Sequence, residues 1–331
     1  MIVRVDDAAA PGSPLLPGEG LGVRASADSL CHDQPRTPER GVDGDTLARP
    51  EDRPPSPGGR GDKARAAVDA LVPRRSARVW RVFAWYGRWY LRRHFHGVRM
   101  LGAGPALPDD RPAVVYLNHP SWWDPMVGVL AADRLLGTRE HFAPIEAAAL
   151  AKYRFFEKLG FFGIDPTTAA GARTFLRRGG AILSRGGRTL WVTAEGTFTD
   201  PRRRPVALRP GVAHLAARLQ DAVIVPLAIE YPFWSERLPE ALLHFGPVME
   251  LADRRRSPRR WHGLLERQLQ HTMDTLAAAA LSRDPGRFTT LLDGGAGVSI
   301  VYDAWRRLRA AARGERFTPA HLDDGQPRGH A

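Results

Sequence analysis

His119 and Asp124 are the pair of side chains in this sequence that is best suited to moving a proton. They lie five positions apart in the segment NHPSWWDP, directly after an apolar run, 113–117, that is typical of a buried strand. A neutral imidazole can accept a proton from a hydroxyl group, and a carboxylate on its other ring nitrogen fixes the tautomer and stabilises the imidazolium. The spacing therefore predicts a general base at the rim of a sheet, where sites are commonly built.

The neighbouring residues indicate how such a base would be used. Ser121 has no Gly-x-Ser-x-Gly turn around it, and no cysteine lies nearby, so a covalent nucleophile is not indicated. The simplest chemistry is direct: His119 activates an incoming hydroxyl, and that hydroxyl attacks an acyl donor. A structural histidine is the competing interpretation, and the pair alone does not decide between the two.

The charge of the chain favours an anionic partner. Lys and Arg number 48 against 36 Asp and Glu, so the formal net charge is +12, and nearly all of the cations are arginine. Such a surface attracts nucleic acid, anionic lipid head groups or phosphorylated donors. No zinc-finger, homeodomain or RNA-recognition signature is present, so nucleic acid is not expected as a partner. The single cysteine, Cys31, excludes a disulfide framework and a Cys-rich metal site, and no metal is expected.

The sequence predicts no signal peptide and no membrane span. Met1 to Val5 is too short for the apolar region of a signal peptide, and Asp6 and Asp7 follow at once. No apolar run approaches the roughly 20 residues that a membrane helix needs. We therefore expect the chain to stay in the cytosol, free or bound to a surface.

The composition divides the chain into four parts. Residues 1–75 are rich in Pro, Gly, Asp and Arg and are predicted to be a disordered arm, because they contain too little apolar surface to offset the entropy of ordering. Residues 76–97 are predicted to form an amphipathic helix. Residues 98–322 are expected to be the main domain, including C-terminal helices, and residues 323–331 a tail.

The amphipathic helix has the composition of a membrane-interfacial segment. Its predicted apolar face consists of Val79, Val82, Phe83, Tyr86, Trp89 and Tyr90. Arg81, Arg88 and Arg92 fall on the opposite face, and Trp80 and Trp85 lie on the flanks. Aromatic rings suit the head-group boundary and guanidinium groups suit lipid phosphates. A helix that simply covers a core is the alternative.

Strands and helices are predicted to alternate along the main domain. The predicted strands are 98–101, 113–117, 140–143, 189–193, 222–229 and 242–245, and the predicted helices are 126–136, 145–159, 167–178, 211–219, 261–281 and 301–312. Gly179 and Gly180 are expected to end the third of these helices. The alternation predicts a mixed α/β domain with a largely buried sheet flanked by helices.

Three later segments carry polar or turn-forming residues at similar places. The segment 159–165 is an apolar loop with glycines, among them Gly163, and it ends in Asp165. The segment 193–197 follows a predicted strand and contains Glu195. The apolar segment 224–229 contains Pro226, which indicates an edge strand or a local break in the ladder.

In this order and spacing, the four segments resemble the four sequence blocks of the glycerolipid acyltransferase family, the 1-acylglycerol-3-phosphate and glycerol-3-phosphate acyltransferases. The resemblance covers about residues 95–250 and is specific only as a combined pattern. The matching residues are Asn118, His119, Ser121 and Asp124 in the first block, Gly160, Ile164 and Asp165 in the second, Glu195, Gly196 and Thr197 in the third, and Val225 and Pro226 in the fourth.

The resemblance implies acyl transfer from acyl-CoA or acyl carrier protein to a lipid hydroxyl, without a cofactor, by a protein bound peripherally to the cytoplasmic side of the cell membrane. It implies that His119 is the general base and Asp124 its orienting partner. The residues implied to bind substrate are Ser121, Gly163, Asp165, Glu195, Gly196, Thr197 and Pro226. The implied partners are the lipid acceptor, the acyl thioester donor and an anionic membrane surface.

The chain departs from the family pattern at two arginines that the family associates with the phosphate of the acceptor. Pro166 and Phe198 occupy these positions, and Ala194 replaces a proline. Either Arg202 to Arg204, or Lys152 and Arg154, supply the charge from a shifted position, or the acceptor is not a simple glycerol phosphate. The second explanation is favoured, because Phe198 and the pair Trp122–Trp123 make the site apolar. A lysolipid with another head group, a glycolipid or a hydroxylated isoprenoid would fit it.

Two other classes of function remain open on the sequence. A hydrolase would use the same histidine to activate water and would release free fatty acid without an acceptor. A non-catalytic lipid-binding protein could retain the fold, although the intact pair His119 and Asp124 argues against it.

Overall fold

The structure is a computed structural model that describes residues 58–251 and 256–295. Most of the predicted arm, the predicted helix 301–312 and the predicted tail lie outside these residues. Lys63 and the described residues after it form one compact unit. Helix α1 (Gly58–Asp69) begins before that unit and lies in a segment for which the sequence predicted no element.

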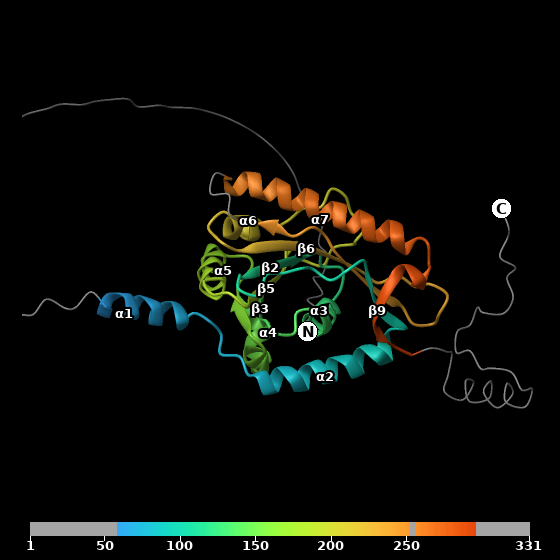
Figure 1. Ribbon diagram of the computed structural model, residues 1–331, viewed down its shortest axis with the longest axis horizontal. Helices are drawn as coiled ribbons and strands as arrows, with labels where there is room; N and C mark the ends of the chain where they lie inside the picture. Colours follow the sequence, from blue (N-terminus) through green and yellow to red (C-terminus); the bar gives the residue numbers. More distant parts are fainter. Residues whose placement is uncertain (1–57, 252–255, 296–331) are drawn as a thin grey trace, which may run out of the picture. The chain divides into compact units, whose positions relative to one another are not determined.

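Within the described residues, nine strands form one sheet in the order β4-β3-β5-β2-β6-β7-β1-β9, with β8 paired to β6 (Figure 1). The strands are β1 (Gly97–Leu101), β2 (Ala113–Leu117), β3 (Glu140–Glu146), β4 (Phe161–Ile164), β5 (Arg188–Thr193), β6 (Val223–Glu230), β7 (Glu240–Phe245), β8 (Met249–Glu250) and β9 (Phe288–Asp293). The run from β4 to β6 is parallel throughout, so the carboxyl ends of these strands meet at one edge of the sheet.

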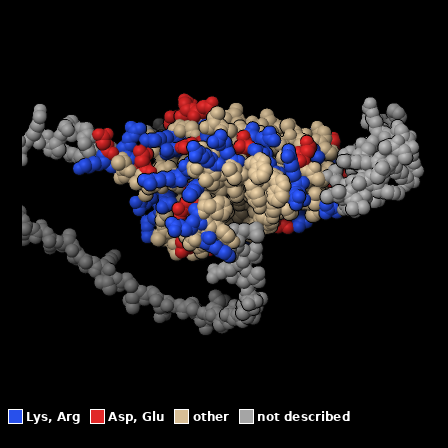
Figure 2. Space-filling view, turned by 90° about the horizontal axis from the view of Figure 1, so that it is seen from below, with Lys and Arg blue, Asp and Glu red and all other residues tan. Residues whose placement is uncertain are grey.

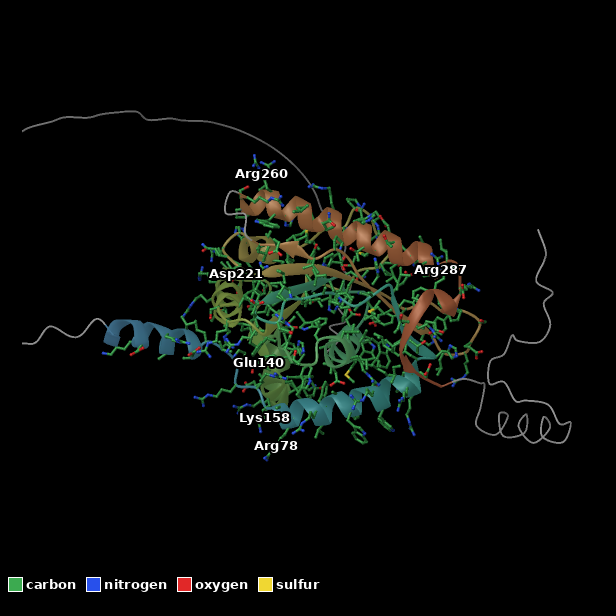
Figure 3. All side chains as sticks on the ribbon, in the orientation of Figure 1. Arg78, Glu140, Lys158, Asp221, Arg260 and Arg287 are labelled. Atoms are coloured by element: carbon green, nitrogen blue, oxygen red, sulfur yellow. The ribbon has the colours of Figure 1, made fainter. Side chains whose placement is uncertain are left out.

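Helices cover both faces of this sheet. They are α2 (Ala77–His94), α3 (Asp124–Leu135), α4 (Ala147–Lys152), α5 (Ala169–Ile182), α6 (Gly211–Ala216) and α7 (Pro258–Ala280), with 3-10 turns η1 (Arg154–Leu159) and η2 (Pro285–Arg287). Figure 1 shows α6 and α7 on one side of the strands and α2 on the other. Arg260 on α7 and Arg78 on α2 point away from the sheet in opposite directions (Figure 3).

The alternation of side chains along β2 divides the core into two layers. Val114 and Tyr116 pack with residues of α5, α6 and α7, whereas Val115 and Leu117 pack with residues of α2 and α3. A strand that buries every residue in this way must lie inside a covered sheet. The mixed α/β class predicted from the sequence, with a largely buried sheet flanked by helices, is confirmed.

The predicted helix 145–159 is wrong at its first two residues, which belong to β3. β3 continues to Glu146, because Ala143 to Glu146 pair in parallel with β4, a strand that the sequence analysis took for a loop. The short helix α4 and the 3-10 turn η1 occupy the rest of the segment. The partner strand decides this local structure, and the periodicity of residues 145–159 does not contain that information.

Gly179 and Gly180 do not end α5, which runs on to Ile182. A Cβ atom at Gly179 would lie 3.3 Å from Leu215 of α6 and 3.4 Å from Leu190 of β5. The glycine therefore permits close packing of the helix against its neighbours.

Pro226 marks a break in a ladder but does not lie on an edge strand. β6 pairs with β2 along one side, where Pro226 lies opposite Tyr116. On the other side, β8 pairs with Val223 and Ile224, and β7 pairs with β6 from Leu227 onward. Pro226 stands at this change of partner, where its missing N–H interrupts no regular pair.

Candidate active site

The first and third sequence blocks meet at the carboxyl edge of the parallel strands. His119 follows β2 and Glu195 follows β5, and these strands are paired in parallel register up to Leu117 and Thr193. Tyr231 follows β6, the neighbour of β2 on its other side. The topology therefore gathers these three side chains from segments that are far apart in the sequence.

His119 and Asp124 form the hydrogen bond that the sequence predicted. The distance from His119 Nδ1 to Asp124 Oδ2 is 2.6 Å, and Asp124 is buried as the first residue of α3. A carboxylate at Nδ1 requires the proton on that nitrogen, which leaves Nε2 with a free lone pair. The pair has the arrangement of a general base with an orienting acid.

Tyr231 is a partner of Asp124 that sequence reasoning missed. Its hydroxyl donates to Asp124 Oδ1 at 2.7 Å, and the amide of Ser121 donates to Oδ2 at 3.3 Å. Burial raises the pKa of Asp124, and the hydrogen bonds from His119, Tyr231 and Ser121 oppose that rise. Tyr231 directly follows β6, the apolar strand beside β2. This position is the sequence signal that could have identified it as a partner of Asp124.

The loop that carries His119 is fixed on two sides. The side chain of Asn118 pairs with the backbone of Ile229 in both directions, through Nδ2 to the carbonyl oxygen at 2.9 Å and through Oδ1 to the amide at 2.8 Å. The amide of His119 donates to Glu195 Oε2 at 2.6 Å. Burial raises the pKa of Glu195, and the bond from the His119 amide counteracts it.

The turn of the third block lies directly against the histidine. The amide of Thr199 donates to the carbonyl oxygen of His119 at 2.9 Å, and the amide of Gly196 donates to Thr193 at 3.1 Å. Gly196 has a φ of 71°, which favours glycine. Both amides are occupied, so an oxyanion formed at the site needs other donors.

Phe198, which stands where the resemblance leads one to expect an arginine, packs against the ring of His119. Its ring centroid lies 4.4 Å from that of His119, and 55% of the side chain is exposed. Trp122 and Trp123 stack on each other at 4.1 Å in the loop between His119 and Asp124. Phe198 thus gives His119 an apolar neighbour, as the sequence analysis expected.

The second block lies farther along the same edge. Gly163 belongs to β4 and packs against α4, since a Cβ atom there would lie 3.2 Å from Ala147. Asp165 is exposed and accepts hydrogen bonds from the amide and hydroxyl of Thr167, which hold the pKa of Asp165 below its usual value. Pro226 is buried inside β6, away from this edge.

The remaining implied substrate-binding residues lie in the first and third blocks. The hydroxyl of Ser121 accepts from the amide of Trp123 at 3.4 Å, so it shapes the loop before α3. Thr197 is exposed, and its carbonyl oxygen accepts from the hydroxyl of Thr199. These residues stand beside His119, whereas Gly163 and Asp165 are separated from it by β3 and β5 in the sheet.

The cations considered as replacements for the absent arginines are mostly occupied. Arg202 forms paired bonds with Asp200, at 2.9 and 2.6 Å. Arg204 binds Asp274 of α7, at 2.8 and 2.6 Å. Lys152 lies over the ring of Tyr153, at 5.4 Å from its centroid.

The part of the chain that the structure describes contains no cluster of three or more His, Cys, Asp or Glu side chains arranged to hold a metal ion. None of the helices in that part combines the length and the apolar character that crossing a membrane requires.

Among solved structures, the chain is similar to the 1-acyl-sn-glycerophosphate (LPA) acyltransferase PlsC from Thermotoga maritima, with 14% sequence identity and a TM-score of 0.45 over 66% of this chain and 83% of that chain. No curated protein matches the chain. A family model described as Acyltransferase matches residues 98–230, which contain His119, Asp124 and Glu195. Residues 98–230 are thus an acyltransferase domain.

Proposed function

We propose that this acyltransferase moves a fatty acyl group from acyl-CoA or acyl carrier protein to a hydroxyl of a lysophospholipid, such as a 1-acylglycerol-3-phosphate-like lipid, or a related lipid acceptor. The observation that carries the proposal is the 2.6 Å bond between His119 Nδ1 and Asp124 Oδ2, with Tyr231 on the second carboxylate oxygen. This arrangement leaves His119 Nε2 as the free base.

The reaction follows from that geometry. His119 Nε2 accepts the proton of the acceptor hydroxyl while the hydroxyl oxygen bonds to the thioester carbonyl carbon, and Asp124 stabilises the imidazolium that forms. The tetrahedral intermediate collapses as the carbon–sulfur bond breaks. The sulfur leaves with the proton from Nε2, so His119 returns to its neutral form and no metal is required.

An exposed, largely aromatic surface on α2 supports a lipid acceptor. Four exposed side chains, Val82, Trp85, Tyr86 and Trp89, form what we call the α2 aromatic surface. The residues of α2 that are buried against the fold are instead Ala84, Gly87 and Leu91. The expected aromatic face is thus divided, because Phe83 and Tyr90 are half-buried against other elements while the α2 aromatic surface is exposed.

Arginines accompany the α2 aromatic surface. The guanidinium of Arg93 lies 4.7 Å from the ring centroid of Trp89, and Arg81 and Arg92 are exposed. Arg88, assigned to the polar face, binds Asp133 of α3 instead. Figure 2, which views the molecule from the side on which α2 lies, shows an uncharged area between groups of Lys and Arg. This combination suits peripheral binding to an anionic bilayer, and we propose the cytoplasmic side of the cell membrane.

Product analysis with the purified protein tests the proposed function. Acyl-CoA and, separately, acyl carrier protein carrying the same chain are supplied with a lysophospholipid, and mass spectrometry measures the diacyl product and free fatty acid. Acceptor-dependent ester that disappears in His119→Ala supports the proposal. Free fatty acid formed at the same rate without an acceptor would identify a hydrolase, and no turnover of any thioester would identify a lipid-binding protein.

A further inference from the structure

Arg209 occupies the junction between the second and third sequence blocks. Its amide donates to the carbonyl oxygen of Ala194 at 2.8 Å, and its Nη1 donates to the carbonyl oxygen of Pro166 at 3.0 Å. Pro166 is one of the two positions where the chain has no arginine, and Ala194 stands four residues before the other. The side chain of Arg209 therefore reaches from the third block to Pro166, one of the two substituted positions.

Gly196 provides the space in which the Arg209 side chain lies. A Cβ atom at Gly196 would be 2.5 Å from Nε of Arg209 and 2.8 Å from its Cδ. The guanidinium thus passes directly over the turn of the third block. This contact fixes Arg209 beside Glu195, whose carboxylate holds the His119 amide.

The charge of Arg209 is not neutralised within the described part of the chain. Its side chain is exposed, and its one hydrogen bond there goes to a neutral carbonyl oxygen. Arg202 and Arg204, by contrast, are each held by a carboxylate. A guanidinium has five N–H donors, so Arg209 retains donors for an anionic ligand.

Arg209 also lies within reach of a substrate bound at His119. Ala194 accepts from Arg209 on one side, and its own amide donates to Leu117 of β2 at 2.9 Å. The backbone of Arg209 is therefore two strand-like spacings, or roughly 10 Å, from the backbone of Leu117. The guanidinium of Arg209 lies against Gly196, next to Glu195, which binds the His119 amide, so a lipid that presents its hydroxyl to His119 can extend its phosphate toward Arg209.

We propose that Arg209 binds the acceptor's phosphate and that the site takes a lysophospholipid whose phosphate is a diester with a single negative charge. The inference rests on the proposed function and names its substrate class. A single guanidinium matches one charge and can bind two phosphate oxygens in a planar fork. A phosphate monoester carries nearly two charges, and the carboxylates of Asp165 and Glu195 beside the junction disfavour the second one.

The test measures kinetics with three acceptors that share one acyl chain: lysophosphatidylglycerol as the diester, lysophosphatidic acid as the monoester and monoacylglycerol without phosphate. Arg209→Gln removes the charge but keeps an N–H donor for Pro166, and Arg209→Lys keeps the charge. Arg203→Gln is the matched control, because Arg203 is an exposed arginine of the same loop.

We expect the wild type to use the diester best. Arg209→Gln should raise KM for the diester by about tenfold or more, the effect of losing one charged hydrogen bond, with kcat nearly unchanged. The wild type and Arg209→Gln should use monoacylglycerol equally well. Arg209→Lys should recover most of the affinity for the diester, and Arg203→Gln should behave as the wild type.

Three results would overturn the assignment. An unchanged KM in Arg209→Gln, or an equal loss with monoacylglycerol, means that Arg209 does not bind the phosphate. A wild-type preference for lysophosphatidic acid over the diester refutes the single-charge acceptor. Thioester cleavage without transfer to any of the three acceptors refutes the proposed function itself, and with it the assignment of Arg209 as the phosphate-binding residue.

Discussion

Tyr231 donates its hydroxyl proton to Asp124 Oδ1 at 2.7 Å, on the carboxylate oxygen opposite the one that binds His119. Asp124 is buried, and burial raises the pKa of a carboxyl group because it disfavours the charged form. The tyrosine hydroxyl favours the ionised carboxylate and holds it in one orientation. Tyr231, Asp124 and His119 therefore form a hydrogen-bonded chain from the residue after β6 through the start of α3 to the loop after β2.

The first prediction concerns the pair at the centre of that chain. His119→Ala should reduce acyl transfer by about 100-fold or more, the usual contribution of a general base. Asp124→Asn should be severely impaired as well, because an amide can stabilise the wrong histidine tautomer. Single-turnover rates of the purified variants, with circular dichroism to verify the fold, measure this. Near-normal turnover of folded His119→Ala would show that the proposed mechanism is wrong.

The second prediction concerns Tyr231. Tyr231→Phe removes one hydrogen bond to Asp124 and should lower kcat by roughly tenfold, with little change in KM for the acceptor. Tyr116→Phe is the matched control, since the Tyr116 hydroxyl is also buried but donates to Leu265 at 3.2 Å, away from Asp124. It should lower stability without lowering kcat. Equal kcat values in the two variants would show that the Tyr231 hydroxyl does not contribute to catalysis.

The third prediction concerns the pH dependence of stability at Glu195. Burial raises the pKa of this carboxyl above its value in the unfolded chain, so folding favours the protonated form. Its contribution to stability is largest below the unfolded pKa of about 4.3 and decreases as pH rises through the folded pKa. Glu195→Gln cannot ionise and can still accept the bond from the His119 amide.

Urea unfolding of wild type and variant across that pH range measures the difference in unfolding free energy. We expect Glu195→Gln to gain stability relative to the wild type as pH rises. Glu157→Gln changes an exposed carboxylate and should show no such trend. A stability difference for Glu195→Gln that does not vary with pH would contradict the prediction.

Local sequence patterns predicted those parts of the structure that depend on neighbouring residues. The apolar run 113–117 is a strand with the predicted bounds, and the short spacing of His119 and Asp124 produces the predicted bond. Strand β4 and Tyr231 depend on partners that lie far away in the sequence. β4 is defined by its pairing with β3, and Tyr231 reaches Asp124 only because β6 lies beside β2. No periodicity within either segment encodes that contact.

The absence of two family arginines was visible in the sequence, but the position of Arg209 was not. Arg209 lies outside all four blocks and reaches Pro166 and Gly196 only in the folded chain. The sequence analysis instead considered Arg202 and Arg204, which are adjacent to the third block. Their pairing with Asp200 and Asp274 became apparent from the fold, since Asp274 belongs to α7.

The fourth prediction concerns the α2 aromatic surface. The protein should sediment with vesicles that contain anionic lipid, and salt should weaken this binding because it screens the arginines. Trp85→Ala with Trp89→Ala should weaken it further, since these side chains are 63% and 44% exposed. Leu281→Ala, which changes an 84% exposed apolar side chain at the end of α7, is the control and should bind as the wild type. Equal recovery in the supernatant with and without vesicles would rule out the surface.

The fifth prediction concerns the arginine cluster of residues 202–204. Arg202 and Arg204 each have a carboxylate partner, so neither offers an unpaired charge to a substrate phosphate. Replacing all three arginines with alanine should therefore leave the ratio of kcat/KM for lysophosphatidic acid to that for a neutral lipid alcohol within about twofold of the wild type, the scale of screened surface charges. Glycerol 3-phosphate should be a poor acceptor for both proteins, because its monoester phosphate carries nearly two charges where Arg209 offers one, and because Phe198 presents an apolar ring beside His119. A variant that loses only lysophosphatidic acid activity, from a wild type that prefers this acceptor, would show that the cluster replaces the missing arginines and that the protein is an ordinary phosphatidate-forming enzyme.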